Sequence, residues 1–311
     1  MWSCPNCESW IIASRICPNC GAWVSDDSAD EQDSDHPVEL AIMGDTLLSC
    51  SGRKAKVVVP AGVKELEEYS FYNDTALQEI ELPEDLTMIL KCAFQECTAL
   101  QEIRLPDKLK RLGRAAFYGC SALRKIEIPA SVKQINTETF RDCTALRVIE
   151  LSEGLEIIGG SVFKGCNALE KIAIPASVKQ IELEAFQDCT ALQEIELSEG
   201  LEKIGESAFK NCSALKKITI PASVKQIEAG AFRDCIALQE ITLLSKDTIF
   251  ETDTFRNCPG VVKRPEDPAE GVKRSGPMDL AEGGTVLKKY HGTDACVIAV
   301  SYTHLTLPTI A

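Results

Sequence analysis

The sequence has 311 residues, enough for one or two domains with a sizeable buried core. Its net charge of −14 at pH 7 argues against a surface built for phosphate backbones, because a polyanion would be repelled before contact. No stretch reaches the roughly 18 to 20 apolar residues needed to cross a bilayer. We therefore expect neither a nucleic-acid partner nor a membrane contact.

Four cysteines near the N-terminus have the spacing of a metal site. Cys4, Cys7, Cys17 and Cys20 form the pattern C-x2-C-x9-C-x2-C. Four thiolates at this spacing suit tetrahedral Zn²⁺ and leave no open position for catalysis. The pattern predicts one structural Zn²⁺ ion, with an iron centre of rubredoxin type or a pair of disulfides as the alternatives. The stretch resembles the short zinc-ribbon domains of many bacterial proteins, which implies a Cys4 zinc ribbon over residues 1–24.

An acidic segment follows. Residues 25–37, SDDSADEQDSDHP, contain six acids and predict a disordered linker. The ribbon itself offers Arg15 as its strong cation, so we expect a docking or regulatory module. The first ten residues, MWSCPNCESW, lack the basic start and apolar stretch of a signal peptide. We expect a cytoplasmic protein, with a cell-surface or secreted protein as the alternative if translation starts upstream.

A period of 23 residues governs most of the remaining chain. The repeat unit is C-x-x-L-x-x-I-x-L-P-x-x-L-x-x-I-x-x-x-A-F-x-x, in about nine copies. The repeated Phe residues are Phe71, Phe94, Phe117, Phe140, Phe163, Phe186, Phe209, Phe232 and Phe255. A Cys follows three residues later at Cys97, Cys120, Cys143, Cys166, Cys189, Cys212, Cys235 and Cys258, and Asp74 takes this place in the first copy.

This period predicts a leucine-rich-repeat solenoid over residues 38–263. The Ile-x-Leu pair alternates like a strand, and the Pro after it ends the pairing. The A-F segment reads as a turn or a short helical piece on the opposite side. One unit cannot bury its apolar side chains alone, so the units must stack, with a parallel sheet on the concave face. Residues 44–63 lead into the array as an N-terminal cap.

Neighbouring units also alternate in type, every 46 residues. IPASVKQI begins at Ile128, Ile174 and Ile220, and LSEGLE begins at Leu151 and Leu197 between them. The repeated residues, from about Val57 to Pro259, resemble the BspA-like family of bacterial leucine-rich-repeat proteins. The resemblance implies a solenoid that binds proteins, and many members of this family are secreted or surface-exposed.

The repeated Cys has three possible explanations. It can pack the turn, with its thiol donating to a backbone carbonyl, since free Cys is among the most buried residue types. It can form disulfides between units, although parallel Cβ vectors do not readily give the required dihedral angle. It can also carry redox or metal chemistry. We favour the packing role.

The outward residues of the predicted strands are the candidate partner-binding surface. They are Glu79, Glu81, Glu102, Arg104, Lys125, Glu127, Glu150, Lys171, Glu194, Glu196, Lys217 and Glu240. The alternative is a solvated face whose charges pair across units, where each pair contributes little to stability. The set contains no Trp or Tyr, so a partner would meet a polar surface without the usual aromatic anchors.

The C-terminal part departs from the repeat. Residues 264–277 read as a linker, and residues 278–299 resemble the N-terminal cap, as if a second, truncated array began there. The last residues, 300–311, match no repeat position. They resemble the translation of a sequencing-library adaptor, and we expect them to be an artefact.

The sequence contains none of the usual catalytic motifs. It has three His residues and no phosphate-binding loop, nucleophile elbow or H-E-x-x-H pattern. We therefore expect no enzyme, but an interaction scaffold that binds a protein partner, with the ribbon as a docking or regulatory module. The alternatives are a surface or secreted adhesin, or the recognition arm of a larger protein with a catalytic domain elsewhere. The sequence does not specify the oligomeric state.

Overall fold

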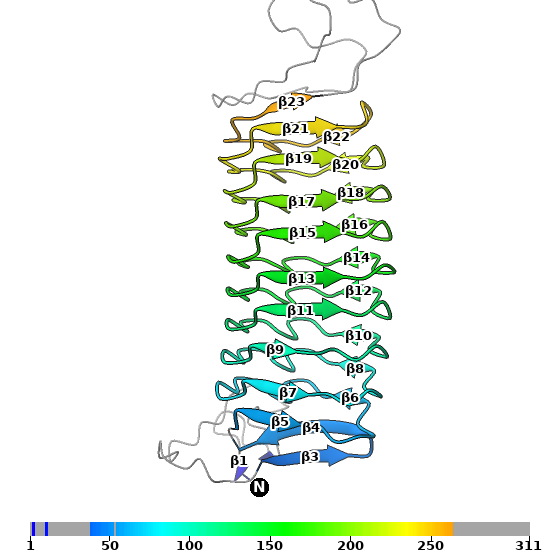
Figure 1. The fold of residues 1–311 in the computed structure, drawn as a ribbon, viewed down its shortest axis with the longest axis vertical. Helices are drawn as coiled ribbons and strands as arrows, with labels where there is room; N and C mark the ends of the chain where they lie inside the picture. Colours follow the sequence, from blue (N-terminus) through cyan, green and yellow to red (C-terminus); the bar gives the residue numbers. More distant parts are fainter. Residues whose placement is uncertain (1, 4–9, 12–37, 53, 264–311) are drawn as a thin grey trace, which may run out of the picture.

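The computed structural model describes residues 2–3, 10–11, 38–52 and 54–263. The described regular structure is entirely β-strand. Residues 38–263 form a solenoid whose 23-residue turns, here called rungs, stack into a column along the longest axis (Figure 1). The predicted parallel solenoid of about nine rungs is confirmed.

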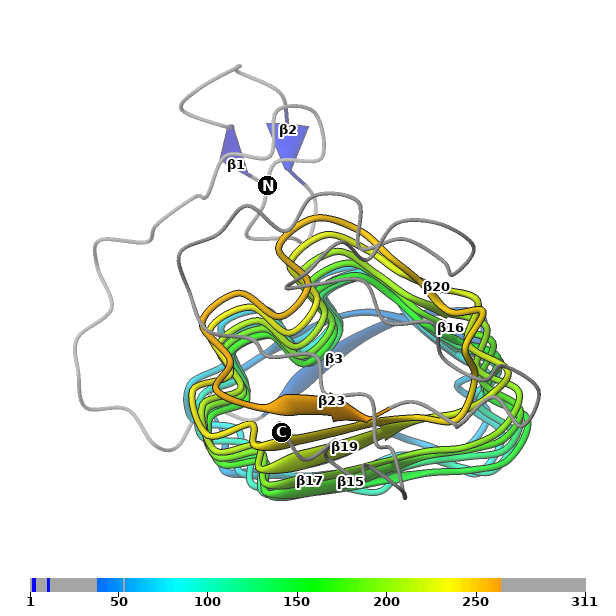
Figure 2. The same cartoon turned by 90° about the horizontal axis from the view of Figure 1, so that it is seen from above.

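Each rung contributes a strand to two sheets on different sides of the column (Figure 2). The front sheet contains β5 (Lys56–Val58), β7 (Glu79–Glu81), β9 (Glu102–Ile103), β11 (Lys125–Ile128), β13 (Val148–Leu151), β15 (Lys171–Ile174), β17 (Glu194–Leu197), β19 (Lys217–Ile220), β21 (Glu240–Leu243) and β23 (Val261–Lys263). The strands from β7 to β21 correspond to the predicted Ile-x-Leu pairs. In the pairs β11–β13, β15–β17 and β19–β21 the strands are parallel, with each residue opposite its counterpart 23 positions later.

The back sheet has eleven strands, most of them two residues long, and was not predicted. It contains β3 (Glu39–Met43), β4 (Thr46–Ser51), β6 (Glu65–Leu66), β8 (Met88–Ile89), β10 (Arg111–Leu112), β12 (Gln134–Ile135), β14 (Ile157–Ile158), β16 (Gln180–Ile181), β18 (Lys203–Ile204), β20 (Gln226–Ile227) and β22 (Ile249–Phe250). The antiparallel hairpin β3–β4 lies at its N-terminal end, where β4 pairs in parallel with β6.

The A-F segment of each rung is a turn and not a helix. Around all nine repeated Phe residues, the residues two before and two after the Phe have positive φ, as at Glu138 (61°) and Asp142 (58°) around Phe140. A right-handed helix needs negative φ at every residue, so two left-handed residues this close prevent one from forming. The turn leaves the Phe side chain pointing into the core.

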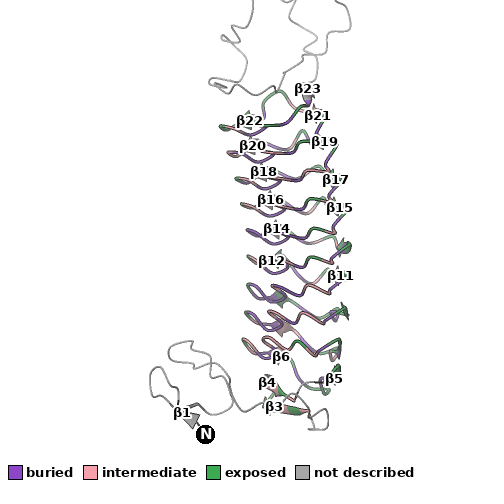
Figure 3. Ribbon diagram, turned by 90° about the vertical axis from the view of Figure 1, so that its left-hand side faces the viewer, coloured by how far each residue is buried: buried purple, intermediate pink, exposed green. Residues whose placement is uncertain are grey.

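The core between the sheets is a continuous apolar column. The nine repeated Phe rings stack from rung to rung, with centroids 5.0 to 5.8 Å apart and interplanar angles of 3° to 26°. The buried residues follow every rung (Figure 3), and the cluster runs from Leu47 to Val262. Each rung therefore covers the apolar face of its neighbour, as the repeat requires.

The 46-residue alternation has a structural counterpart in the front sheet. The strand ladder is continuous from β5 to β13, from β15 to β17 and from β19 to β23, and it is interrupted between these groups. We call a rung whose front strand ends in the IPAS motif a PAS rung, and one whose front strand ends in the LSEG motif a SEG rung. Both interruptions fall where a SEG rung is followed by a PAS rung. The two rung types are therefore not equivalent.

Side chains bridge each interruption. At the first, the backbone N–H of Gly154 donates to Ser177 Oγ at 2.9 Å, and the N–H of Gly160 donates to Glu182 Oε2 at 2.9 Å. At the second, Glu199 accepts the N–H groups of Ala222 and Ser223, each at 3.1 Å. Within the front sheet, two rungs thus form one unit joined by the front ladder. The back ladder, the backbone bonds of the turns and these side chains join it to the next unit.

Candidate functional site

All twelve residues predicted as a binding surface lie on or beside the front sheet, and all are exposed. The strand alternation places them outward because the Ile between them points into the core, as the exposed–buried–exposed pattern of β7 shows. Figure 2 shows no other described strand over this side of the column. The front sheet is thus an open surface of charged side chains.

Many of these charges pair with one another across rungs. Lys125 Nζ lies 2.7 Å from Glu150 Oε1, and Lys171 Nζ lies 2.7 Å from Glu194 Oε2. At the two ends of the sheet, Lys56 contacts Glu79 and Glu81, and Lys263 contacts Glu240. After β9, Arg104 approaches Glu84 at 3.5 Å. The alternative of a solvated face with cross-rung pairs therefore describes part of the surface. Exposed pairs of this kind add little stability.

Four of the predicted residues have no ion pair within 4 Å among the described residues: Glu102, Glu127, Glu196 and Lys217. A partner can reach their charges without first breaking an internal pair. These four residues are the part of the surface that is most available for binding.

The sequence interpretation missed a further row of exposed residues. They lie immediately before the front strands and include Arg124 and Arg147 on adjacent rungs. On β13 the apolar Val148 occupies an outward position and is 44% exposed. The signal was present in the sequence, because both arginines hold the first variable position of L-x-x-I.

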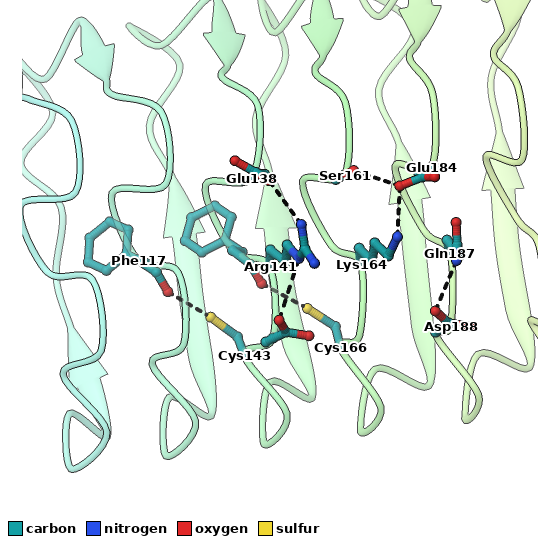
Figure 4. Close-up of polar contacts among 12 residues, drawn as sticks. Phe117, Glu138, Arg141, Cys143, Ser161, Lys164, Cys166, Glu184, Gln187 and Asp188 are labelled. Carbon is teal, nitrogen blue, oxygen red and sulfur yellow. Dashed lines mark hydrogen bonds and ion pairs between the residues drawn. The ribbon is translucent and has the colours of Figure 1, made fainter.

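The repeated Cys residues are buried donors, which confirms the first of the three explanations. Each thiol donates to the carbonyl oxygen of the Phe 26 residues earlier, at 2.9 to 3.2 Å. Figure 4 shows two of these bonds, from Cys143 to Phe117 and from Cys166 to Phe140. All ten described cysteines are free. Burial raises the pKa of the Cys143 and Cys166 thiols well above the usual range, so they are poor nucleophiles.

Polar contacts also join the turns on the surface above this row (Figure 4). Glu138 accepts hydrogen bonds from Arg114 of the preceding rung and from Arg141 of its own rung, both at 2.9 Å. Partial burial opposes its charge, but these bonds hold the pKa of Glu138 below its usual range. A hydrogen bond from Lys164 likewise lowers the pKa of Glu184. These contacts join neighbouring rungs.

The predicted zinc ligands Cys4, Cys7, Cys17 and Cys20 lie outside the described residues. The short strands on either side of the first CPNC, β1 (Trp2–Ser3) and β2 (Trp10–Ile11), pair antiparallel, with Trp2 opposite Ile11. Four thiolates are a donor set that fits Zn²⁺. In the part of the chain that the structure describes, no group of three or more His, Cys, Asp or Glu residues could hold a metal.

None of the described residues form a helix long and apolar enough to cross a bilayer.

Comparison with known proteins agrees with this architecture. The profile of the BspA type leucine-rich repeat region, with six copies, matches residues 64–191 and 156–263. A leucine-rich repeat protein of T. pallidum is 29% identical, with a TM-score of 0.53, and the match covers 58% of this chain and 87% of that one. No curated protein matches the chain.

Two further solved structures resemble the chain less closely. A leucine-rich repeat protein from Bacteroides ovatus is 23% identical, with a TM-score of 0.33, and the match covers 67% of this chain and 78% of that one. The pneumococcal vaccine antigen PcpA is 18% identical, with a TM-score of 0.36, and the match covers 68% of each chain.

Proposed function

The chain belongs to the BspA-type leucine-rich-repeat family, and from that premise we propose that it is a non-enzymatic scaffold whose front sheet binds a protein partner. One observation carries the proposal. Ten strands present their outward side chains in register on a surface that no other described strand covers. Such a surface offers many contacts at fixed spacing, which suits an extended or folded protein better than a small molecule.

The ion pairs between rungs fix the positions of the charges that a partner would meet on the front sheet. They hold Lys125 and Lys171 in place without removing them from solvent, since each lysine side chain is more than half exposed. The surface lacks aromatic anchors, so charge complementarity and shape determine the choice of partner. Affinity therefore depends strongly on salt concentration.

The N-terminal module is proposed to be a zinc ribbon that docks or regulates the scaffold in the cytoplasm. Two features support it: the spacing of the four cysteines and the antiparallel pairing of β1 and β2 around the first pair. The four thiolates would hold one Zn²⁺, which supplies folding free energy to a segment too short to bury a core of its own.

Charge reversal tests the front sheet. Lys125, Lys171 and Lys217 are changed together to Glu in the full chain, and proteins captured from an extract of the source organism are compared by quantitative mass spectrometry. The matched control changes Lys110, Lys133 and Lys179 to Glu, three exposed lysines that precede or adjoin the back strands. Circular dichroism and the thermal midpoint verify that both variants fold.

We expect the front variant to lose at least one captured protein that the control retains. If the front variant captures the same proteins as the unchanged chain, in the same amounts, the front-sheet proposal is wrong. If a protein is no longer captured by either variant, its binding depends on the net charge of the chain and not on the front sheet. That outcome counts against the proposal.

A further inference from the structure

One part of the front sheet indicates the chemical class of the partner segment that would bind there. We propose that Arg124, Arg147 and Val148 form a docking point for an acidic segment of the partner protein, with an aliphatic side chain beside its carboxylates. This inference rests on the proposed function and adds the chemical class of the partner.

The two arginines lie side by side on adjacent rungs. The backbone N–H of Arg147 donates to the carbonyl oxygen of Arg124 at 3.0 Å. Parallel neighbours in a sheet lie about 4.8 Å apart, so the two guanidinium groups extend from nearly the same place. Both residues are exposed.

The carboxylate beside this pair of cations in the same row is that of Glu170, at the equivalent position on the rung after Arg147. Among the described residues, no carboxylate lies within 4 Å of Arg124 or Arg147, although the neighbouring lysines have partners. Like charges on adjacent strands are destabilising, and an external anion would relieve that cost. Guanidinium groups bind carboxylates through two parallel hydrogen bonds, so two stacked arginines fit two nearby Asp or Glu side chains.

Val148 adds an apolar contact beside the arginines. It is opposite Lys125 in the ladder, and it is 44% exposed. It also lies on β13, the last strand before the first interruption of the front ladder. A partner residue that packs on Val148 while its neighbours reach the arginines would gain both contacts at once.

The surroundings exclude a polyanion such as nucleic acid. Glu127 and Glu150 are exposed on the same two strands, and the chain as a whole carries a charge of −14. A continuous phosphate backbone would have to cross these acids. A short acidic segment with carboxylates on one side can avoid them.

The test measures binding of a defined probe to the full chain by fluorescence anisotropy. The probe is a labelled peptide of about twelve residues in which Asp and Glu alternate with Leu and Val, and the reference peptide carries Asn and Gln instead. The variants are R124E/R147E and Val148→Ser. The matched control is K110E/R111E, which reverses two adjacent exposed cations at the back sheet.

We expect the acidic peptide to bind, and the reference peptide to bind at least about tenfold more weakly, which corresponds to 1.4 kcal/mol. R124E/R147E should weaken binding of the acidic peptide by at least the same factor, and Val148→Ser by several-fold, with K110E/R111E unchanged. The inference is overturned if the acidic peptide does not bind, or if the control loses as much affinity as R124E/R147E.

The capture experiment separates this inference from the proposed function. If reversal of Lys125, Lys171 and Lys217 releases a partner that R124E/R147E retains, the front sheet binds proteins and the acidic docking point is wrong. If neither variant releases a partner, both proposals fail.

Discussion

The thiol of Cys143 donates a hydrogen bond to the carbonyl oxygen of Phe117, 26 residues earlier in the chain, at 3.1 Å. The same oxygen accepts the backbone N–H of Cys120 at 3.2 Å. One carbonyl therefore closes the turn of its own rung and holds the cysteine of the next. Because the arrangement recurs in eight rungs, the row of thiols is a structural seam along the column.

Replacing Cys143 by Ala should lower the free energy of unfolding by about 1 to 2 kcal/mol, through a lost hydrogen bond and a small cavity. The loss is moderate because the Phe117 oxygen keeps its bond from Cys120. Urea unfolding at pH 7 measures the change. Cys50→Ala is the control, since Cys50 is only partly buried and should cost less. Equal losses for the two variants would show that the seam has no special role.

The seam also predicts how stability depends on pH. Burial raises the pKa of six of its thiols: Cys97, Cys120, Cys143, Cys166, Cys189 and Cys212. In the unfolded chain these thiols ionise near pH 8.5, whereas in the folded chain they stay protonated. The stabilisation that these protonated thiols add to the free energy of unfolding is therefore complete below about pH 8. It is lost as the pH rises through the range where the thiols of the unfolded chain release their protons.

Above the pKa that it has in the unfolded chain, each such thiol lowers the free energy of unfolding by about 1.4 kcal/mol per pH unit. The free energy of unfolding should be nearly constant from pH 7 to 8 and should fall steeply from about pH 9 upward. The double variant C143A/C166A should fall less steeply, by about 3 kcal/mol per pH unit. Urea unfolding between pH 7 and 10.5 measures both slopes. Parallel slopes would mean that other groups control the alkaline transition.

The sequence was sufficient for the features that recur with strong side-chain signals. The Ile-x-Leu alternation located the front strands, and the burial of Cys among apolar residues predicted the thiol's role. The back sheet was missed because its strands are two residues long, as at Gln134–Ile135, and so contain one inward residue with no alternation to detect. The positive φ values at Glu138 and Asp142 were missed because neither residue is Gly.

The pairing of the surface charges also lay beyond the sequence. Lys125 has Glu102 and Glu127 nearby, yet its ion pair is with Glu150, because that carboxylate lies within reach on the next rung. The sequence placed all four residues on one face, and only the side-chain geometry distinguishes a paired charge from an available one. The same geometry showed Arg124 and Arg147 to lack partners among the described residues.

The N-terminal cysteines predict one Zn²⁺ per chain, bound by thiolates. Metal analysis by mass spectrometry should find one zinc ion per purified full chain. It should find none in the C4S/C17S variant, because the two remaining cysteines cannot hold the ion. Cys50→Ser should retain the zinc. The β-sheet signal in circular dichroism should survive removal of the metal, since the solenoid core is apolar and contains no metal site within the described residues. Zinc that persists in C4S/C17S would place the site elsewhere.

The alternation of rung types predicts that the array tolerates deletions of 46 residues better than deletions of 23. Deleting residues 152–197 joins Leu151 to Ser198, so a SEG rung still follows a PAS rung. Deleting residues 175–197 joins Ile174 to Ser198 and places two SEG loops on successive rungs. The shorter deletion removes the Ser177 hydroxyl that accepts the N–H of Gly154 and the Glu182 carboxylate that accepts the N–H of Gly160.

The 23-residue deletion also places the carboxylates of Glu153 and Glu199 on successive rungs, where they repel each other. In the native array each of these carboxylates instead accepts a backbone N–H from the next rung. Each lost hydrogen bond costs about 1 kcal/mol, so the 23-residue deletion should be less stable than the 46-residue deletion by about 2 kcal/mol or more. The urea midpoints of the two variants measure this difference. If the longer deletion is the less stable of the two, stability follows the number of rungs alone, and the 46-residue unit has no energetic basis.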